Sequence, residues 1–134
     1  MPHLTLEYSA NLHDAGRLGE LCQGLAATLV AQVDEDGRAV FPIGGVRVRA
    51  LRCDDCCIAD GSPDIGFVHA TLKIAAGRTD AVKRSTGDAL FDEIKQHFAH
   101  QFAEQGLALS LELQELGEAG TWKHNNLHAR FRKD

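Results

Sequence analysis

Alternating hydrophobic and polar positions predict a β-strand at the start of the chain. One face of residues 2–8 carries Leu4, Leu6 and Tyr8, and the other carries His3, Thr5 and Glu7. Successive side chains of a strand point to opposite sides, so this pattern is typical of a strand with one buried face. The hydrophobic positions then change to helical spacing from Leu18 to Val33. Asp34-Glu35-Asp36-Gly37 predicts the end of that helix, with glycine suited to a C-terminal cap.

The same succession of patterns is repeated further along the chain. A second strand is predicted over residues 46–51, after the turn-forming Pro42, Gly44 and Gly45, and residues 54–64 are predicted to form a loop. A third strand is predicted over 65–75 and a fourth over 107–114. Between them, residues 79–104 predict a long amphipathic helix that Thr79 or Asp80 could cap. A short terminal strand is predicted near 127–131.

These elements predict a single α+β domain over residues 1–134, built from a duplicated βαβ unit. The halves span about 2–53 and 65–116, followed by a tail at 117–134, and residues 2–8 share His, Thr and Leu in step with residues 68–74. Right-handed crossovers would pair the two units into one four-stranded sheet with both helices on one face. We expect the other face to be apolar and to be covered by further copies of the chain.

Composition and charge narrow the classes of function. The chain of 134 residues is 44% hydrophobic with a formal net charge of −5, which is typical of a folded protein and argues against nucleic-acid binding. No hydrophobic run approaches the ~18–20 residues of a membrane helix, and no secretory signal is recognisable. The cysteines, at Cys22, Cys53, Cys56 and Cys57, are therefore expected to be thiols of a cytoplasmic protein.

Proline at position 2 is a candidate general base. Removal of Met1 would leave Pro2 with a free secondary amine at the start of a strand. An α-amine has an ordinary pKa of about 7.7–8.0, and burial and nearby cations lower it. Proton-transfer catalysis needs a base whose pKa lies near the working pH, held in a fixed position.

Two arginines and a cysteine cluster are further candidates. Arg47 lies on the predicted second strand and Arg78 follows Gly77 at a turn, and either side chain could instead be an ordinary surface charge. Cys53 and Cys56 have the spacing of zinc and redox motifs. A structural zinc site usually needs four ligands, so we assign no metal to them. The loop with these cysteines follows the strand of Arg47 and is therefore a candidate for lining the site.

Short blocks occur in order along nearly the whole chain. They are Met1-Pro2-His3, Phe41-Pro42 with Gly45-Val46-Arg47, Ala59-Asp60-Gly61, Phe67-Val68-His69 with Thr71-Leu72-Lys73-Ile74, Ala76-Gly77-Arg78, and Asn125-Asn126 with His128-Ala129. Together they resemble the tautomerase superfamily, and more closely the 5-carboxymethyl-2-hydroxymuconate Δ-isomerases of aromatic-acid degradation. The resemblance implies a homotrimer with an active site at each subunit junction and Pro2 as the base. It also implies that Arg47 and Arg78 bind the substrate.

The implied activity is isomerisation of an unsaturated 2-hydroxy or 2-keto dicarboxylic acid, with a dienol or dienolate intermediate. A fixed cation stabilises the negative charge that develops on oxygen, and planar arginine side chains suit carboxylates. Pro2, Arg47 and Arg78 are a sufficient set for this chemistry, so we expect no metal or organic cofactor. Two alternatives remain open: a decarboxylase or hydratase of a related acid on the same scaffold, and a non-catalytic trimeric binding protein.

Overall fold

The computed structural model describes residues 1–132 and confirms the predicted strand–helix–strand order in both halves; residues 133–134 of the predicted tail lie outside the described residues. The main elements are β1 (His3–Ser9), α1 (Leu18–Val30), β2 (Arg47–Cys53), β3 (Ile65–Ala75), α2 (Asp80–His97), α3 (Ala99–Glu104), β4 (Gly106–Leu116) and α4 (Leu127–Arg130). Short 3₁₀ turns occur at Ala10–Leu12 (η1), Ile43–Gly45 (η2) and Glu118–Gly120 (η3).

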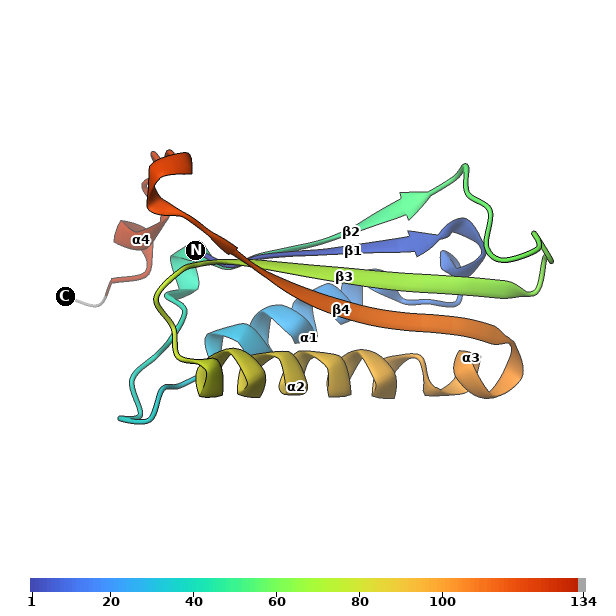
Figure 1. Cartoon of the computed structure of the whole chain (residues 1–134), viewed down its shortest axis with the longest axis horizontal. Helices are drawn as coiled ribbons and strands as arrows, with labels where there is room; N and C mark the ends of the chain where they lie inside the picture. The colour runs from blue at the N-terminus through green and yellow to red at the C-terminus, as the bar shows by residue number, and fades with distance from the viewer. Residues whose placement is uncertain (133–134) are drawn as a thin grey trace.

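The strands form one four-stranded sheet in the order β2-β1-β3-β4. β1 is parallel to β2, β3 is parallel to β4, and the two central strands are antiparallel. Each half therefore contributes one parallel pair, and α1 and α2 lie side by side beneath the same face (Figure 1). This arrangement confirms the duplicated βαβ unit with both helices on one face of the sheet.

The core lies between the sheet and the helices and follows from the predicted periodicities. Leu4 and Leu6 of β1 and Leu72 of β3 point toward the helices and are fully buried. Leu25 of α1 and Leu90 of α2 meet them from the other layer, also with 0% exposure. Full burial of one such side chain stabilises the fold by about 1.5–3 kcal/mol. This packing holds β1, and with it the chain terminus, in a fixed place.

Both long helices are shorter than predicted. α1 ends at Val30, and Val33 is 56% exposed and forms an isolated bridge to Ala39 instead. The helix predicted over 79–104 is interrupted at Phe98, whose fully buried ring anchors the break between α2 and α3. Its start is as predicted, because the Thr79 side chain accepts a hydrogen bond from the backbone N–H of Val82 at 3.2 Å.

The predicted terminal strand near 127–131 is wrong, because the structure has the short helix α4 there. The Asn125 side-chain oxygen accepts a hydrogen bond from the backbone N–H of Leu127 at 3.1 Å. Such a local bond satisfies one of the free donors at the start of a helical turn. Short-range capping therefore decides the conformation of this segment, where the hydrophobic pattern alone suggested a strand.

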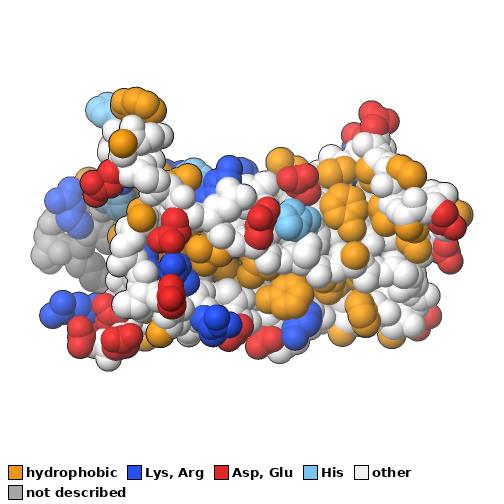
Figure 2. All heavy atoms as spheres, in the orientation of Figure 1, with side chains coloured by type: hydrophobic (Ala, Val, Ile, Leu, Met, Phe, Trp, Pro, Cys, Tyr) orange, Lys and Arg blue, Asp and Glu red, His pale blue; other side chains and the backbone are white. Residues whose placement is uncertain are grey.

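The uncovered face of the sheet is largely polar, so the expectation of an apolar face is also wrong. It carries His3, Thr5, Glu7, Arg47, Arg49, His69, Thr71, Lys73, Ser110, Glu112 and Gln114. Its apolar residues, such as Leu51 and Phe67, lie toward the end of the sheet at which β4 begins. Figure 2 shows hydrophobic side chains gathered toward that end, on the right.

Candidate active site

Pro2 lies at the open end of the sheet and is buried. Its carbonyl oxygen accepts a hydrogen bond from the backbone N–H of Arg47 at 3.1 Å, directly before His3 pairs with Arg47 in the β1–β2 register. The sheet ladder therefore extends to Pro2 and keeps the first residues of the chain from fraying. Figure 1 marks this terminus at the left end of the strands.

Several cations surround the terminal amine. With Met1 in place the free amine belongs to Met1, and the Pro2 nitrogen is an amide. Burial lowers the pKa of the Met1 amine below its ordinary value of 8.0, and the charges of Arg78, Lys123 and Arg47 lower it further. The structure thus brings the predicted residues Pro2, Arg47 and Arg78 to one end of the sheet.

Main-chain oxygens hold both predicted arginines. The Arg47 Nη1 donates to the carbonyl of Gly44 at 3.2 Å. Arg78 donates from Nη1 to the carbonyl of Ala75 at 3.0 Å and from Nη2 to the carbonyl of Val40 at 3.1 Å. Its guanidinium also lies over the Phe41 ring, 5.2 Å from the centroid, in cation–π geometry. Arg78 is therefore fixed between the β3–α2 turn and the segment that leads into β2.

A cavity of about 330 Å³ opens beside the chain terminus, within the range of small-molecule sites. Its lining residues are Met1, His3, Ala75, Ala76, Leu116, Gly117, Glu118, Thr121, Trp122 and Lys123. A larger hollow of about 540 Å³ lies along α2 and β4, where Lys83 is engaged with Asp80 and Glu115. We assign the chemistry to the smaller cavity, because it alone of these two contains the terminal amine.

The sequence analysis did not select Trp122 or Lys123, although both line the cavity. The structure folds the tail back to the chain terminus: a Cβ atom on Gly45 would lie 3.3 Å from Met1 Cα and 3.6 Å from His128 Cε1. The absence of a side chain at Gly45 thus lets both Met1 and His128 of α4 approach the same turn. The only signal in the sequence was the proximity of Lys123 to the Asn125-Asn126 block.

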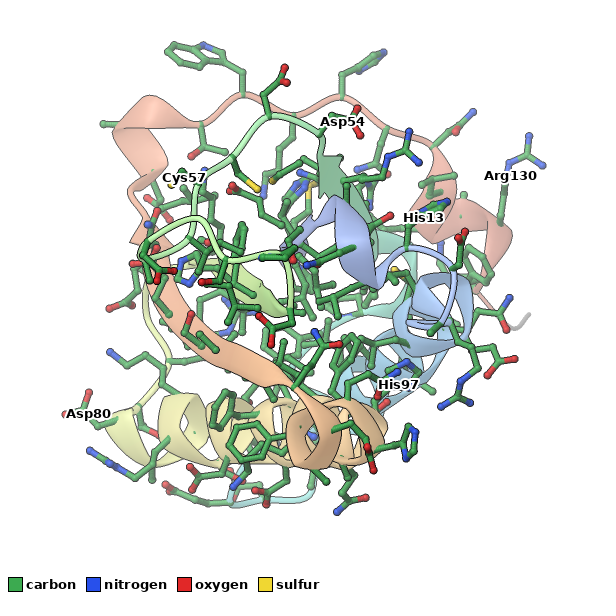
Figure 3. All side chains as sticks on the ribbon, turned by 90° about the vertical axis from the view of Figure 1, so that its right-hand side faces the viewer. His13, Asp54, Cys57, Asp80, His97 and Arg130 are labelled. Carbon is green, nitrogen blue, oxygen red and sulfur yellow. The ribbon has the colours of Figure 1, made fainter. Side chains whose placement is uncertain are left out.

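The cysteine loop does not line this site within one chain. Cys53 pairs with Ser9 at the far end of β1, and at ~3.3 Å rise per residue it lies roughly 20 Å along β2 from Arg47. Figure 3 looks at the molecule from this end, with Asp54 and Cys57 on the open side of the sheet and His97 in the helix layer.

In residues 1–132 no group of three or more His, Cys, Asp or Glu side chains is placed to hold a metal ion. The same residues contain no helix of the length and hydrophobicity required to span a membrane.

Comparison with known proteins gives a consistent family. Residues 2–131 match the family described as 5-carboxymethyl-2-hydroxymuconate isomerase. The 5-carboxymethyl-2-hydroxymuconate Δ-isomerase of Escherichia coli is 39% identical over 132 residues, covering 98% of this chain and 100% of the relative. The crystal structure of a 5-carboxymethyl-2-hydroxymuconate isomerase from Deinococcus radiodurans R1 superposes with a TM-score of 0.89 at 51% identity, covering 98% of this chain and 95% of that one.

More distant structures share only the fold. A fused 4-OT structure superposes with a TM-score of 0.65 at 20% identity over 96% of this chain and 98% of its own. At that identity the likeness shows that the duplicated βαβ scaffold is common to both proteins, and it carries no statement about shared activity.

Proposed function

The chain belongs to the 5-carboxymethyl-2-hydroxymuconate isomerase family, and from this premise we propose that it isomerises 5-carboxymethyl-2-hydroxymuconate or a close analogue without a cofactor. The observation that carries the proposal is the buried chain terminus, whose amine has a lowered pKa beside Arg47 and Arg78. A free amine in this place can act as a base near neutral pH, and the adjacent cations suit an acid with several carboxylates.

The proposed reaction needs Pro2 as the first residue. After removal of Met1, the Pro2 nitrogen is a secondary amine with a free lone pair. It removes the hydroxyl proton of the dienol, the C–O bond becomes a carbonyl, and the double bonds shift along the chain. A distant carbon then takes the proton from the prolinium. No electrons are gained or lost, so neither an oxidant nor a reductant is required.

The two arginines take different parts in this proposal. The backbone N–H of Arg47 donates a hydrogen bond to the Pro2 carbonyl, so Arg47 is held next to the proposed base. Its guanidinium is therefore suited to the oxygen on which charge develops. Arg78 is held by two carbonyl oxygens and an aromatic ring, and such a fixed fork is suited to anchoring a carboxylate.

We further propose that the protein is a cytoplasmic homotrimer with its sites at the subunit junctions. A cytoplasmic location fits four free thiols. The trimer is supported by exposed apolar residues in the described part of the chain, including Trp122 and Phe131, and by an apolar groove between α1 and η2. A fused 4-OT of the same fold forms a symmetric trimer. Light scattering would test this, and a monomer at every concentration would reject the trimer and the shared site.

The decisive experiment compares a free and a blocked Pro2. Purified protein is first checked by intact mass for loss of Met1, and loss of the dienol is then followed by ultraviolet absorbance. A variant with residues added before Pro2 should lose ~10²–10⁴-fold in kcat/KM, the usual contribution of a general base. Proteolytic release that leaves Pro2 first should restore activity. Full activity in a verified blocked chain would reject Pro2 as the base.

The product distinguishes the proposed reaction from its alternatives. Isomerisation leaves the mass of the acid unchanged, whereas decarboxylation removes carbon dioxide and hydration adds water. A protein that binds the acid and returns it unaltered would be a binding protein. Mass spectrometry of the reaction mixture identifies the decarboxylated and the hydrated product. Loss of the ultraviolet absorbance of the dienol at unchanged mass then separates isomerisation from binding alone.

A further inference from the structure

We propose that Lys123 binds the carboxymethyl group of the substrate and thereby sets a preference for acids with a third carboxylate. This inference rests on the proposed function, which it extends from the class of reaction to the recognition of one substituent. It concerns a residue that entered the site only through the fold, because the tail after β4 returns to the chain terminus.

The position of Lys123 places its charge at the site. Lys123 lines the 330 Å³ cavity together with Met1, Ala76 and Trp122. Its charge lowers the pKa of the Met1 amine more than the charge of Arg47 does, and less than that of Arg78. Lys123 is thus a third cation at the terminal amine, comparable in electrostatic effect to the two predicted arginines.

The number of cations matches the number of acid groups. A muconate has a carboxylate at each end of its diene, and the carboxymethyl substituent adds another. Arg47 is assigned to the reacting oxygen, which lies next to the carboxylate at one end, and Arg78 is assigned to the carboxylate at the other end. Lys123 is then left for the substituent. Among residues 1–132 Lys123 has no ion-pair partner, so its ammonium is available to a ligand. Glu118 lines the same cavity and opposes anions, so the positive charges must outweigh it.

The kind of cation also matches the kind of acid group. The end carboxylates are conjugated with the flat diene, and planar guanidinium forks held by main-chain carbonyls suit fixed, planar partners. The third carboxylate is joined to the diene through a saturated CH2 group and can rotate. A lysine ammonium on a flexible stem can follow it, because it acts as a point charge without a required plane. Lys123 lies on the exposed segment after η3, where such a stem has room to move.

The experiment compares two substrates that differ only in the carboxymethyl group. Lys123→Met removes the charge and keeps an unbranched side chain, while Lys123→Arg retains the charge. Lys95→Met removes a similar exposed lysine from α2, away from the cavity, and serves as the matched control. Each variant is assayed with 5-carboxymethyl-2-hydroxymuconate and with 2-hydroxymuconate. If the latter binds without turnover, its inhibition constant replaces KM.

Lys123→Met should raise KM for the carboxymethyl substrate by about 10–100-fold, the equivalent of one charge-assisted hydrogen bond. It should leave KM for 2-hydroxymuconate within about twofold, since no interaction is lost there. Lys123→Arg should recover most of the affinity, and Lys95→Met should match the wild type on both substrates. Equal effects on the two substrates, or none, would overturn the role of Lys123 and leave the isomerase intact. A wild-type protein inactive on both acids would instead reject the proposed function.

Discussion

The two βαβ halves share one scaffold and differ in the charges around equivalent histidines. In the first half His3 lies beside Arg49, whose Nη1 donates to His3 Nδ1 at 3.3 Å. Burial lowers the pKa of His3, and the charges of Arg49 and Arg47 lower it further. In the second half His69 lies 3.1 Å from a Glu112 oxygen, and His69 lowers the pKa of that carboxyl group through a hydrogen bond.

This difference gives the first half the positive charge that the proposed anion-binding site needs. Thr5 faces Arg49 across the β1–β2 pair, and Thr71 faces Glu112 at the matching place of the β3–β4 pair. The exchange of a cation for an anion puts a carboxylate beside His69 in the second half, where the first half has a guanidinium beside His3. The first half keeps the positive charges of Arg47 and Arg49 near the amino terminus. The two halves share their backbone geometry, and the difference between Arg49 and Glu112 makes the first half the one suited to bind an anion.

The largest loss of activity is expected when Arg47 of the first half is removed. Arg47→Ala should lower kcat by ~10²–10³-fold, because a cation that stabilises the developing oxyanion acts in the transition state. Arg49→Ala is the matched control, since Arg49 lies two residues further along the same face of β2. Steady-state kinetics of both variants would measure this, and equal losses would show that β2 contributes only general charge.

Removing Arg78 should affect both binding and folding. Arg78→Ala should raise KM with little change in kcat, as expected for an anchor that binds ground and transition states alike. It should also lower the free energy of unfolding by about 1–2 kcal/mol, because the carbonyls of Ala75 and Val40 lose their donors. Denaturant titration would measure the second effect. Unchanged stability would show that water replaces these hydrogen bonds.

The pH dependence of kcat/KM tests whether the charges of the first half act on the terminal amine. With Met1 in place, the charges of Arg78, Lys123 and Arg47 lower the pKa of the terminal amine, and His3 and Glu118 line the same cavity. We expect the pKa of the Pro2 amine to be lowered in the same direction once Met1 is removed. A lowered pKa means that the unprotonated, active form persists to lower pH. The kcat/KM profile should therefore rise with pH to a plateau, with its midpoint below 8.0. Lys123→Met removes one cation and should move this midpoint to higher pH, whereas an unmoved midpoint would separate Lys123 from the amine.

The smallest effect is expected in the second half. Glu112→Gln removes the carboxylate that is hydrogen-bonded to His69 on an exposed part of the sheet. The pKa of Glu112 is lowered in the fold, so its contribution to stability is present at neutral pH and is lost as the pH falls through that lowered pKa. Exposed pairs contribute little, so kcat/KM should stay unchanged and the unfolding midpoint should move only slightly. A large loss of activity would place the second half in the site.

The sequence was sufficient for the scaffold because each predicted element has a strong local pattern. The alternation around Leu4 and Leu6 and the cap at Thr79 both appear in the structure as predicted. Pro2, Arg47 and Arg78 could be selected because each has a functional group suited to the reaction and lies in a sequence block that resembles the family. Their separate roles stay predictions.

The parts that could not be predicted depend on contacts between distant segments. Lys123 joins the cavity only because the tail packs against the turn at Gly45, and nothing local to residue 123 encodes that contact. The cysteine loop was expected near Arg47 because it follows the same strand in the sequence. Arg47 and Cys53 lie at opposite ends of β2, so the loop is far from Arg47. The uncovered face is polar because the residues that alternate with the buried positions, such as His3 and Thr5, are polar. The expectation of an apolar face did not take these residues into account.

The closeness of the first residues of the chain to the segment after β4 has a consequence for biosynthesis. The cavity joins Met1 and His3, which the ribosome makes first, to Trp122 and Lys123, which it makes near the end. A nascent chain that still lacks the tail can form β1 and α1 but cannot close this wall. On the proposed mechanism, activity therefore requires completed translation, because products of premature termination carry Pro2 without the tail residues that line the cavity.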